Sequence, residues 1–489
     1  IDIQLPKAEW DRIRVQKRSF SSVLTKEVPD SPFTYARGTI TLDGVTIKDV
    51  GIRKKGFLGS LDDNRPSLKI RFDKYVEQSP VEGIDRLTLN NNKQDPSRLS
   101  QYLGYRFFNQ SGSIAPRCAL VRVTVNGKYL GIYSNVESIK KPMLKRCFGD
   151  GSGALYEGTV TDFYPSFIQR FERKTKIARK KPIRKVAEIL AEKDLDLEDL
   201  EKRVDLKSFI RYWATESLLG FWDGYSNNQN NYFIYRHPET KKFHCIPWGA
   251  DALFTENMPL PPFRVRPRFV YRTSLLSNRL YRQSSTQKQY HATMKELLDK
   301  HWNEKELLAE VDRMEALLKN RVDKSNTGFA GALRRLRAFI SGRKKTLQEE
   351  MKNGPVELKE QARKPIYMKT VGTITSTFKG KWFSKTPRNP EKLGEVKTLS
   401  IKKGDKVIEL QNVGVYAETS KWPPVPRGTQ RPPTVVIQGK RKSDGKNVRL
   451  IVGLSIEQFK PSNGKRIKVE GMMIVGQLFT FRPEMSFVG

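Results

Sequence analysis

The sequence predicts an α+β fold followed by a separate all-β module, and three observations support this. Short runs of alternating apolar and polar residues fill the first 140 residues, which is typical of strands. Apolar residues at helix spacing occur at residues 186–219 and 275–351, and beyond residue 366 only strand-like runs divided by Gly, Pro and Asn remain. Because 489 residues are too many for one core, we expect a β-rich lobe (1–140), a mainly helical lobe (141–353) and a β-sandwich or barrel (365–489).

The N-terminal strands are predicted to carry a cationic face beside a glycine loop. Asp43-Gly44 predicts a hairpin turn. The strand after it continues as the basic sequence GIRKKG at residues 51–56 and runs into a glycine loop. Residues 67–72 alternate strictly, which places Lys69 on a polar face opposite three apolar side chains. Such a face suits contacts with phosphate, and the alternative is an exposed edge strand with solvated charges.

A helix and a hairpin follow these strands. Asp95-Pro96 predicts the start of a helix that runs to about Asn109, because Asp is a preferred N-cap and Pro fits the first turn. Asn126-Gly127 between two alternating runs is the clearest hairpin signal in the chain.

The stretch from residue 213 to residue 254 combines the residue types of a phosphoryl-transfer site. An apolar helix pattern ends at Asp223, a loop with four asparagines follows, and a predicted strand pair then leads to Asp251. This places one carboxylate before a hairpin, a carboxamide such as Asn231 at its start and another carboxylate after it. Phosphoryl transfer needs an Asp that orients a hydroxyl, and an Asn and an Asp that hold Mg²⁺ on the phosphates. The alternative is that Asp-Gly and Asn-rich segments only form turns.

The chain is strongly basic. It has 90 Lys and Arg residues against 53 Asp and Glu, a net charge of +37. This excess predicts attraction to polyanions or phosphates, but no nucleic-acid motif is present, so we expect no specific nucleic-acid partner. The basic run at residues 163–185 is either a mobile insert that docks an acidic protein or a solvated helix face.

The location of the protein is predicted from two features. No run of eighteen apolar residues occurs, so we expect no transmembrane helix. The sequence starts at Ile1 without Met, which favours a removed leader and an exported or cell-surface protein over a cytoplasmic one.

Several ordered motifs resemble the spore-coat protein H (CotH) kinase-like family over about residues 1–300. The motifs are GIRKKG at 51–56, RPSLKIRF at 65–72, VNGKYLGIY at 125–133, DGY at 223–225, NNYFIY at 230–235 and IPWGAD at 246–251. The resemblance implies an atypical bilobal protein-kinase-like fold. It does not reach the module at 365–489, for which the architecture alone suggests binding or attachment.

The resemblance also implies an activity, which is transfer of the ATP γ-phosphate to Ser or Thr of a protein substrate with Mg²⁺ or Mn²⁺. We expect that substrate to be acidic or Ser-rich. The residues that it assigns are Asp223 and Lys69 for catalysis, Asn231 and Asp251 for the metal, and Arg53, Lys55, Lys69 and Trp248 for ATP.

Two positions depart from the family pattern. Gln101 stands where the family usually has the helix Glu that pairs with the strand lysine. Gly249 stands where the family tends to have a first Asp in the motif that ends at Asp251. Two hypotheses therefore remain. One is an active protein kinase, and the other is a catalytically weak relative that acts as a binding or structural surface protein, with polyanion binding as a further possibility.

Overall fold

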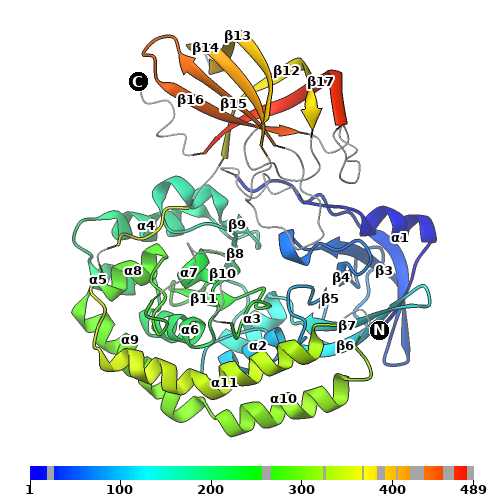
Figure 1. The fold of residues 1–489 in the computed structure, drawn as a ribbon. Coiled ribbons are helices and arrows are strands. Elements are labelled where there is room, and N and C mark those ends of the chain that lie inside the picture. Colours follow the sequence, from blue (N-terminus) through cyan, green and yellow to red (C-terminus); the bar gives the residue numbers. More distant parts are fainter. Residues whose placement is uncertain are drawn as a thin grey trace. The chain divides into compact units, whose positions relative to one another are not determined.

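The computed structural model describes residues 1–18, 27–255, 266–322, 327–358, 360–365, 368–382, 391–403, 406–418, 434–454 and 467–481. The chain divides into two compact units. The first comprises Ile1–Val23 and Glu27–Pro365, and the second comprises Leu24–Lys26 and Ile366–Gly489 (Figure 1).

The first unit begins with a closed β-barrel in the strand order β1-β2-β3-β4-β5-β7-β6. Its strands are β1 (Asp2–Gln4), β2 (Ala36–Leu42), β3 (Val45–Lys55), β4 (Ser67–Arg71), β5 (Arg86–Asn90), β6 (Cys118–Val125) and β7 (Lys128–Val136). Neighbours pair antiparallel except β1 with β6. Both predicted hairpins are confirmed, since Asp43-Gly44 and Asn126-Gly127 all have positive φ, as a tight type I′ turn requires.

Strand β4 lies inside the barrel wall, between β3 and β5. The alternative of an exposed edge strand is therefore wrong for residues 67–72, because both edges of β4 are hydrogen-bonded. Leu68, Ile70 and Phe72 are fully buried in the barrel core, and Lys69 on the opposite face stands beside Arg53 of β3 in the ladder.

The helix α2 (Ser100–Gln110) begins later than predicted. Arg98 has a φ of 65°, a left-handed conformation that a helix does not continue through. The carboxylate of Asp95 instead holds the preceding turn, accepting from the backbone N–H of Ser97 at 2.9 Å and of Ser100 at 2.8 Å.

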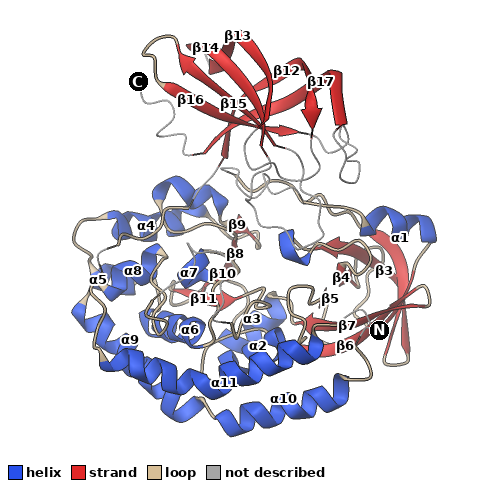
Figure 2. Ribbon diagram, viewed as in Figure 1, coloured by secondary structure: helices blue, strands red, loops and turns tan. Residues whose placement is uncertain are grey.

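A second sheet and a layer of helices complete the first unit (Figure 2). The sheet has the order β11-β10-β8-β9, and its strands are β8 (Ala154–Gly158), β9 (Glu172–Arg173), β10 (Tyr232–Arg236) and β11 (Phe243–Pro247). The helices besides α2 are α1 (Lys7–Arg14), η2 (Leu58–Ser60), α3 (Lys141–Phe148), η3 (Pro165–Arg170), α4 (Lys180–Ala191), α5 (Leu197–Glu201), α6 (Leu206–Leu218), α7 (Tyr225–Asn228), α8 (Leu275–Tyr281), α9 (Ser284–Glu296), η5 (Leu297–His301), α10 (Glu304–Leu318) and α11 (Phe329–Lys352). Most of them pack on a large apolar core that includes the fully buried Trp213 of α6, whereas α1 packs on the barrel core and α3 on a smaller cluster.

The basic run at residues 163–185 is part of this packed layer. It forms η3, β9 and the start of α4. Helix α4 buries Ile183 and Val186 and leaves Lys181, Arg184 and Lys185 exposed, as an amphipathic surface helix does. Helix α4 therefore presents the solvated, charged face of the second alternative, and docking of an acidic protein by this run stays a prediction.

The second unit contains a sheet in the order β12-β17-β16-β15-β14-β13, with antiparallel neighbours. Its strands are β12 (Met368–Trp382), β13 (Glu391–Lys403), β14 (Lys406–Glu418), β15 (Thr434–Arg441), β16 (Asn447–Leu454) and β17 (Ile467–Phe481). The prediction of an α+β region followed by a strand-only region is confirmed for the part of the chain that the structure describes.

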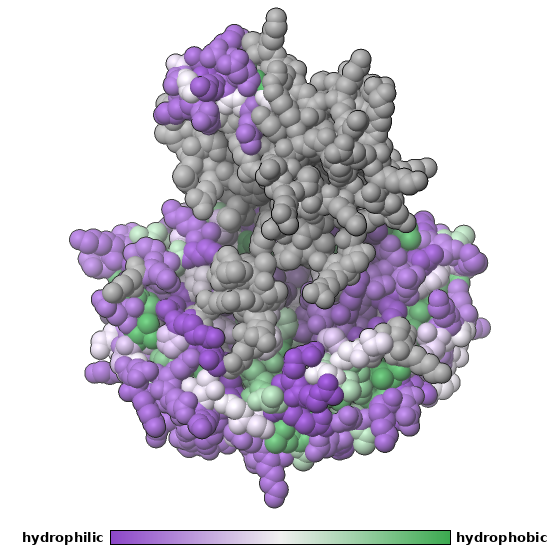
Figure 3. All heavy atoms as spheres, viewed as in Figure 1, coloured by the Kyte–Doolittle hydropathy of each residue, from purple (hydrophilic) through white to green (hydrophobic). Residues whose placement is uncertain are grey.

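The surface of the first unit is mainly hydrophilic on the face shown in Figure 3. No helix among the described residues has both the length and the apolar composition needed to cross a membrane.

Candidate active site

Asp223 lies just after α6, in a turn that brings the asparagine-rich loop back onto its carboxylate. Helix α6 is capped by Asp205, whose carboxylate accepts from the Ser208 N–H at 2.8 Å, and the chain reverses at Gly220, which has a φ of 65°. The Asp223 carboxylate then accepts from the side-chain amides of Asn228 (2.6 Å), Asn230 (3.2 Å) and Asn231 (2.7 Å). Three asparagines therefore hold the Asp223 carboxylate in place. A loop that only formed a turn would not need these side-chain contacts.

A buried glutamate holds this turn in place. Glu216 of α6 accepts from the Tyr212 hydroxyl at 2.6 Å and from the backbone N–H groups of Tyr225 and Ser226, both at 2.9 Å. A Cβ atom at position 224 would lie 2.2 Å from its Oε1, so only glycine fits there. Burial raises the pKa of Glu216 to about 7. Glu216 was not among the predicted site residues, although an acidic residue within an apolar helix run is a signal of a buried functional carboxylate.

Asp251 lies close to Asp223. The strand pair β10–β11 is extended by a hydrogen bond from the Trp248 N–H to the Asn231 carbonyl (2.9 Å), and Asp251 follows three residues later. Burial raises the pKa of Asp251 to about 6; the neighbouring Asp223 charge also raises it, while a hydrogen bond from Gln94 and the charge of Lys55 lower it. The structure thus brings the predicted residues Asp223, Asn231 and Asp251 together.

This oxygen-rich cluster fits a hard divalent cation. Two neighbouring carboxylates whose pKa values are both raised by burial are stabilised by a cation between them. Mg²⁺ typically binds through one or two carboxylates and completes its shell with water and substrate phosphates. Within the described residues no group of three or more His, Cys, Asp or Glu side chains has metal-site geometry, so an amide oxygen or a phosphate would have to contribute.

Gly249 gives the Asn231 amide its space. Its φ is 54°, and a Cβ atom there would lie 2.8 Å from Asn231 Oδ1. A side chain at position 249 would therefore push Asn231 away from its present place. The departure from the family pattern at this position has a local structural role in this chain.

A cationic wall stands beside Asp251. Arg53 and Lys55 come from β3, and Lys69 comes from β4. Burial, together with the charges of Arg53 and Lys55, lowers the pKa of Lys69 to about 7, and the charge of Glu157 opposes this shift. Burial also lowers the pKa of Lys55, while the charge of Asp251 raises it. The wall is therefore electrostatically coupled to the carboxylate cluster.

Trp248 packs against this wall. The Lys55 Nζ atom lies 5.9 Å from the centre of the Trp248 ring, within cation–π range.

Glu157, not Gln101, is the acidic neighbour of Lys69. The Gln101 side chain is buried and donates to Asn92 Oδ1 at 3.1 Å. Glu157 lies on β8 and forms an ion pair with Lys174. Burial raises the pKa of Glu157, but the charges of Lys174 and, to a lesser extent, Lys69 outweigh burial and lower it. Glu157 was not predicted as a site residue, because β8 pairs with β10 and β9 in the second sheet and its approach to Lys69 is a contact between segments far apart in the sequence.

A cavity of about 340 Å³ opens onto Asp251. It is lined by Gln94, Asp95, Pro96, Ser97, Ser100, Trp222, Asp251, Ala252, Leu253, Phe254, Thr255, Ala332, Arg335 and Leu336. A Cβ atom on Gly59 would lie 1.5 Å from Gln94 Oε1, so the glycine loop packs directly on the residue that hydrogen-bonds Asp251. Gly59 belongs to the predicted glycine loop, whereas Gln94 is a further residue that the sequence did not single out.

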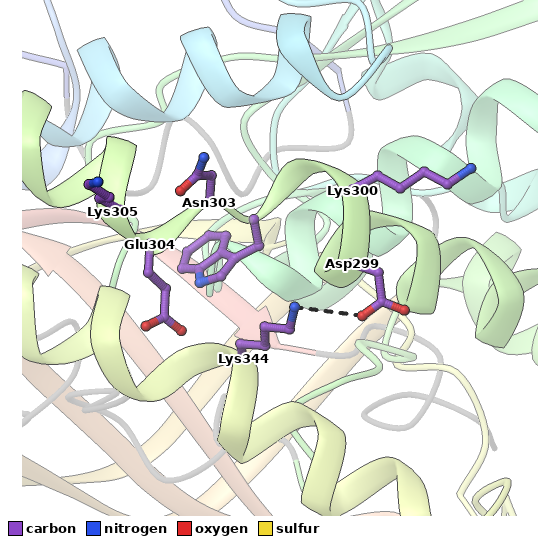
Figure 4. Close-up of a pocket in the computed structure, with 7 residues that line it drawn as sticks. Asp299, Lys300, Asn303, Glu304, Lys305 and Lys344 are labelled. Atoms are coloured by element: carbon purple, nitrogen blue, oxygen red, sulfur yellow. Dashed lines mark ion pairs between the residues drawn. The ribbon is translucent and has the colours of Figure 1, made fainter.

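Another cavity, of about 410 Å³, lies elsewhere in the helical layer (Figure 4). It is lined by Asp299, Lys300, Trp302, Asn303, Glu304, Lys305 and Lys344, and Lys344 pairs with Asp299 at 3.6 Å. The lining includes none of the predicted site residues, so the 340 Å³ cavity is the one associated with the candidate active site.

Comparisons with known proteins agree with the motifs. The family model described as CotH kinase protein matches residues 52–353. The inner spore coat protein H of Bacillus subtilis is 28% identical over 195 residues, which are 36% of this chain and 52% of that protein. The invasin CotH3 of Rhizopus delemar is 25% identical over 193 residues, covering 35% of this chain and 32% of the invasin. The chain thus spans about half the length of these relatives or less.

Among solved structures, the crystal structure of a Helicobacter pylori proinflammatory kinase, CtkA, is similar at 10% identity and a TM-score of 0.27, covering 65% of this chain and 94% of that one. The family model matches more than half of the chain, and the protein therefore belongs to the CotH kinase protein family.

Proposed function

We propose that the protein is a bilobal, kinase-like enzyme that transfers the ATP γ-phosphate to a Ser or Thr hydroxyl of a protein. The observation that supports this most strongly is the pairing of Asp223 and Asp251 through the asparagine-rich loop, beside the cationic wall of β3 and β4. Membership of the CotH kinase protein family supports the same reaction class.

Asp223 is the group that orients the acceptor in this proposal. Three side-chain amides fix its carboxylate, which leaves little freedom for it to rotate. The acceptor oxygen forms a bond to the γ-phosphorus while the bond from that phosphorus to the β–γ bridging oxygen breaks. The hydroxyl proton passes to the Asp223 carboxylate.

Asp251 and Asn231 would hold Mg²⁺ or Mn²⁺, which when bound neutralises charge on the phosphates. Arg53, Lys55 and Lys69 contact phosphate oxygens, and Trp248 covers the wall from the β11 side. The 340 Å³ cavity provides room next to Asp251 for a reacting group.

The test is transfer of label from γ-labelled ATP to a Ser-rich acidic protein, comparing the wild type with Asp251→Asn. We expect the variant to lose at least about 100-fold in rate, as loss of one electrostatic contact at a reacting phosphate does, and to lose metal-dependent ATP binding. Full transfer by Asp251→Asn would show that the site is assigned wrongly.

A second candidate function is binding of polyanions by a catalytically weak protein. The net charge of +37, Gln101 and Gly249 favour it. It predicts binding to an anionic polymer that weakens steeply with salt and is unaffected by Asp251→Asn. Salt-independent binding would remove this candidate.

We also propose an exported or surface location. Two relatives carry the names of an inner spore coat protein and an invasin. Surface labelling of intact producing cells should modify the protein, and labelling only after lysis would contradict the proposal.

A further inference from the structure

Residues 173–185 form an unusually cationic surface. They contain eight Lys and Arg residues and no Asp or Glu. Two of the eight point inward, since Lys174 pairs with Glu157 and Glu172 and Lys180 donates to backbone carbonyls of residues 168, 169 and 171. The remaining six are exposed and are termed the basic platform, namely Arg173, Lys176, Arg179, Lys181, Arg184 and Lys185.

The basic platform stands on a fixed scaffold. Helix α4 buries Ile183 and Val186 fully. The Tyr156 hydroxyl of β8 donates to the Arg179 carbonyl at 2.6 Å and accepts from the Arg179 N–H at 2.9 Å. Because the backbone is anchored at both places, a ligand that binds these cations does not have to order the segment first.

Most positive charges of the basic platform have no acidic partner within the part of the chain that the structure describes. Lys185 pairs with Glu188 at 2.8 Å, whereas Arg173, Lys176, Lys181 and Arg184 form no ion pair with any residue that the structure describes. Their mutual repulsion is relieved when anions bind between them. Ile177 lies among them with 59% of its surface exposed, which adds an apolar contact point to a charged surface.

The basic platform also adjoins the candidate active site through one ion pair. Lys174 immediately follows Arg173 and binds Glu157, the acidic neighbour of Lys69. A polypeptide bound along the platform would therefore lie close to the cationic wall.

We propose that the basic platform docks an acidic segment of the protein acceptor, with carboxylates against Lys176, Lys181 and Arg184 and an apolar side chain against Ile177. The proposal rests on the proposed kinase function, for which it names the substrate class. An acidic polypeptide suits this surface better than a nucleic acid, because the exposed apolar contact is an isoleucine and residues 173–185 include no aromatic side chain for base stacking.

The first experiment measures binding of a fluorescent Ser-containing peptide rich in Glu to the full chain. The triple variant Lys176→Glu, Lys181→Glu, Arg184→Glu should bind about tenfold or more weakly at low salt. A matched triple variant, Arg122→Glu, Lys128→Glu, Lys345→Glu, changes the net charge equally at exposed positions elsewhere and should bind as the wild type does. The proposal would be overturned if both triple variants bound the peptide equally weakly, or if neither bound it more weakly than the wild type.

Two further readouts separate this inference from the proposed reaction. In phosphate transfer, the platform triple should raise KM for the acidic peptide about tenfold with kcat unchanged, and should leave KM for a neutral Ser peptide unchanged. If no variant transfers phosphate but the difference in peptide binding persists, the reaction is wrong and the docking surface stands. If single-stranded RNA binds more tightly than the acidic peptide and only the platform triple abolishes that binding, the surface serves nucleic acid and the proposal fails.

Discussion

At Asp251, burial and a neighbouring carboxylate raise the pKa in the same direction, to about 6. An acid whose pKa is higher in the folded than in the unfolded state destabilises the fold when it ionises. The metal-free protein therefore loses stability from this group as pH rises from about 4 to about 6, and the penalty is constant above that range. A bound cation would remove this penalty, because it stabilises the ionised form of Asp251.

The affinity of the site for a divalent cation should depend on pH through Asp251. Because the metal binds the ionised carboxylate, Mn²⁺ affinity should rise as pH increases from 5 to 6 and level off above about pH 6.5, up to about tenfold per unit. Titration calorimetry from pH 5 to 8 measures this. Asp251→Asn should remove the dependence, and a flat profile in the wild type would contradict the assignment of Asp251.

At the scale of elements, the local signals in the sequence predicted the structure well. The hairpins at Asn126-Gly127 and β10–β11 were predictable because turn chemistry and alternation agree. The start of α2 was predicted wrongly, because the left-handed Arg98 interrupts a run that has good capping residues. Closure of the barrel, in which β1 pairs with β6 and β5 with β7, and the approach of Glu157 to Lys69 depend on contacts between distant segments, which local patterns do not encode.

The charge of Glu157 should support ATP binding through Lys69. Removing its charge with Glu157→Gln should lower the pKa of Lys69 below about 7, so that a smaller fraction of Lys69 stays charged at and above pH 7. ATP should then bind several-fold more weakly at pH 8 and almost normally at pH 6. Fluorescent-nucleotide titrations across this range measure it.

The matched control for Glu157→Gln is Glu172→Gln, which removes the other carboxylate that pairs with Lys174. Its pH profile should follow the wild type. A pH-independent loss of affinity in Glu157→Gln would indicate a general structural defect and would contradict a role through Lys69.

At the scale of the whole molecule, the first compact unit extends beyond the region that the family model matches. That match ends at residue 353, whereas the unit ends at Pro365. Arg363 donates to Asn228 at 2.9 Å and to Gln229 at 3.2 Å, and its charge lowers the pKa of Asp223. The predicted lobe boundary near residue 140 and the role of residues 365–489 stay predictions.

Truncation of the chain tests whether the site depends on Arg363. A chain ending at residue 365 should transfer phosphate within about twofold of the full protein, whereas a chain ending at 353 should lose about tenfold or more, because Asp223 loses its cationic neighbour. Arg363→Ala in the full chain should reproduce part of that loss. Equal activity of the two truncated chains would show that Arg363 does not support the site.

The role of Asp223 in phosphate transfer is best measured by a single-turnover assay of Asp223→Asn with saturating Mn²⁺ and γ-labelled ATP. We expect ATP affinity close to that of the wild type and transfer slower by about 100-fold or more, because the variant keeps the metal residues Asn231 and Asp251 and loses the base for the acceptor. Transfer at the wild-type rate would contradict the role of Asp223 and with it the proposed mechanism.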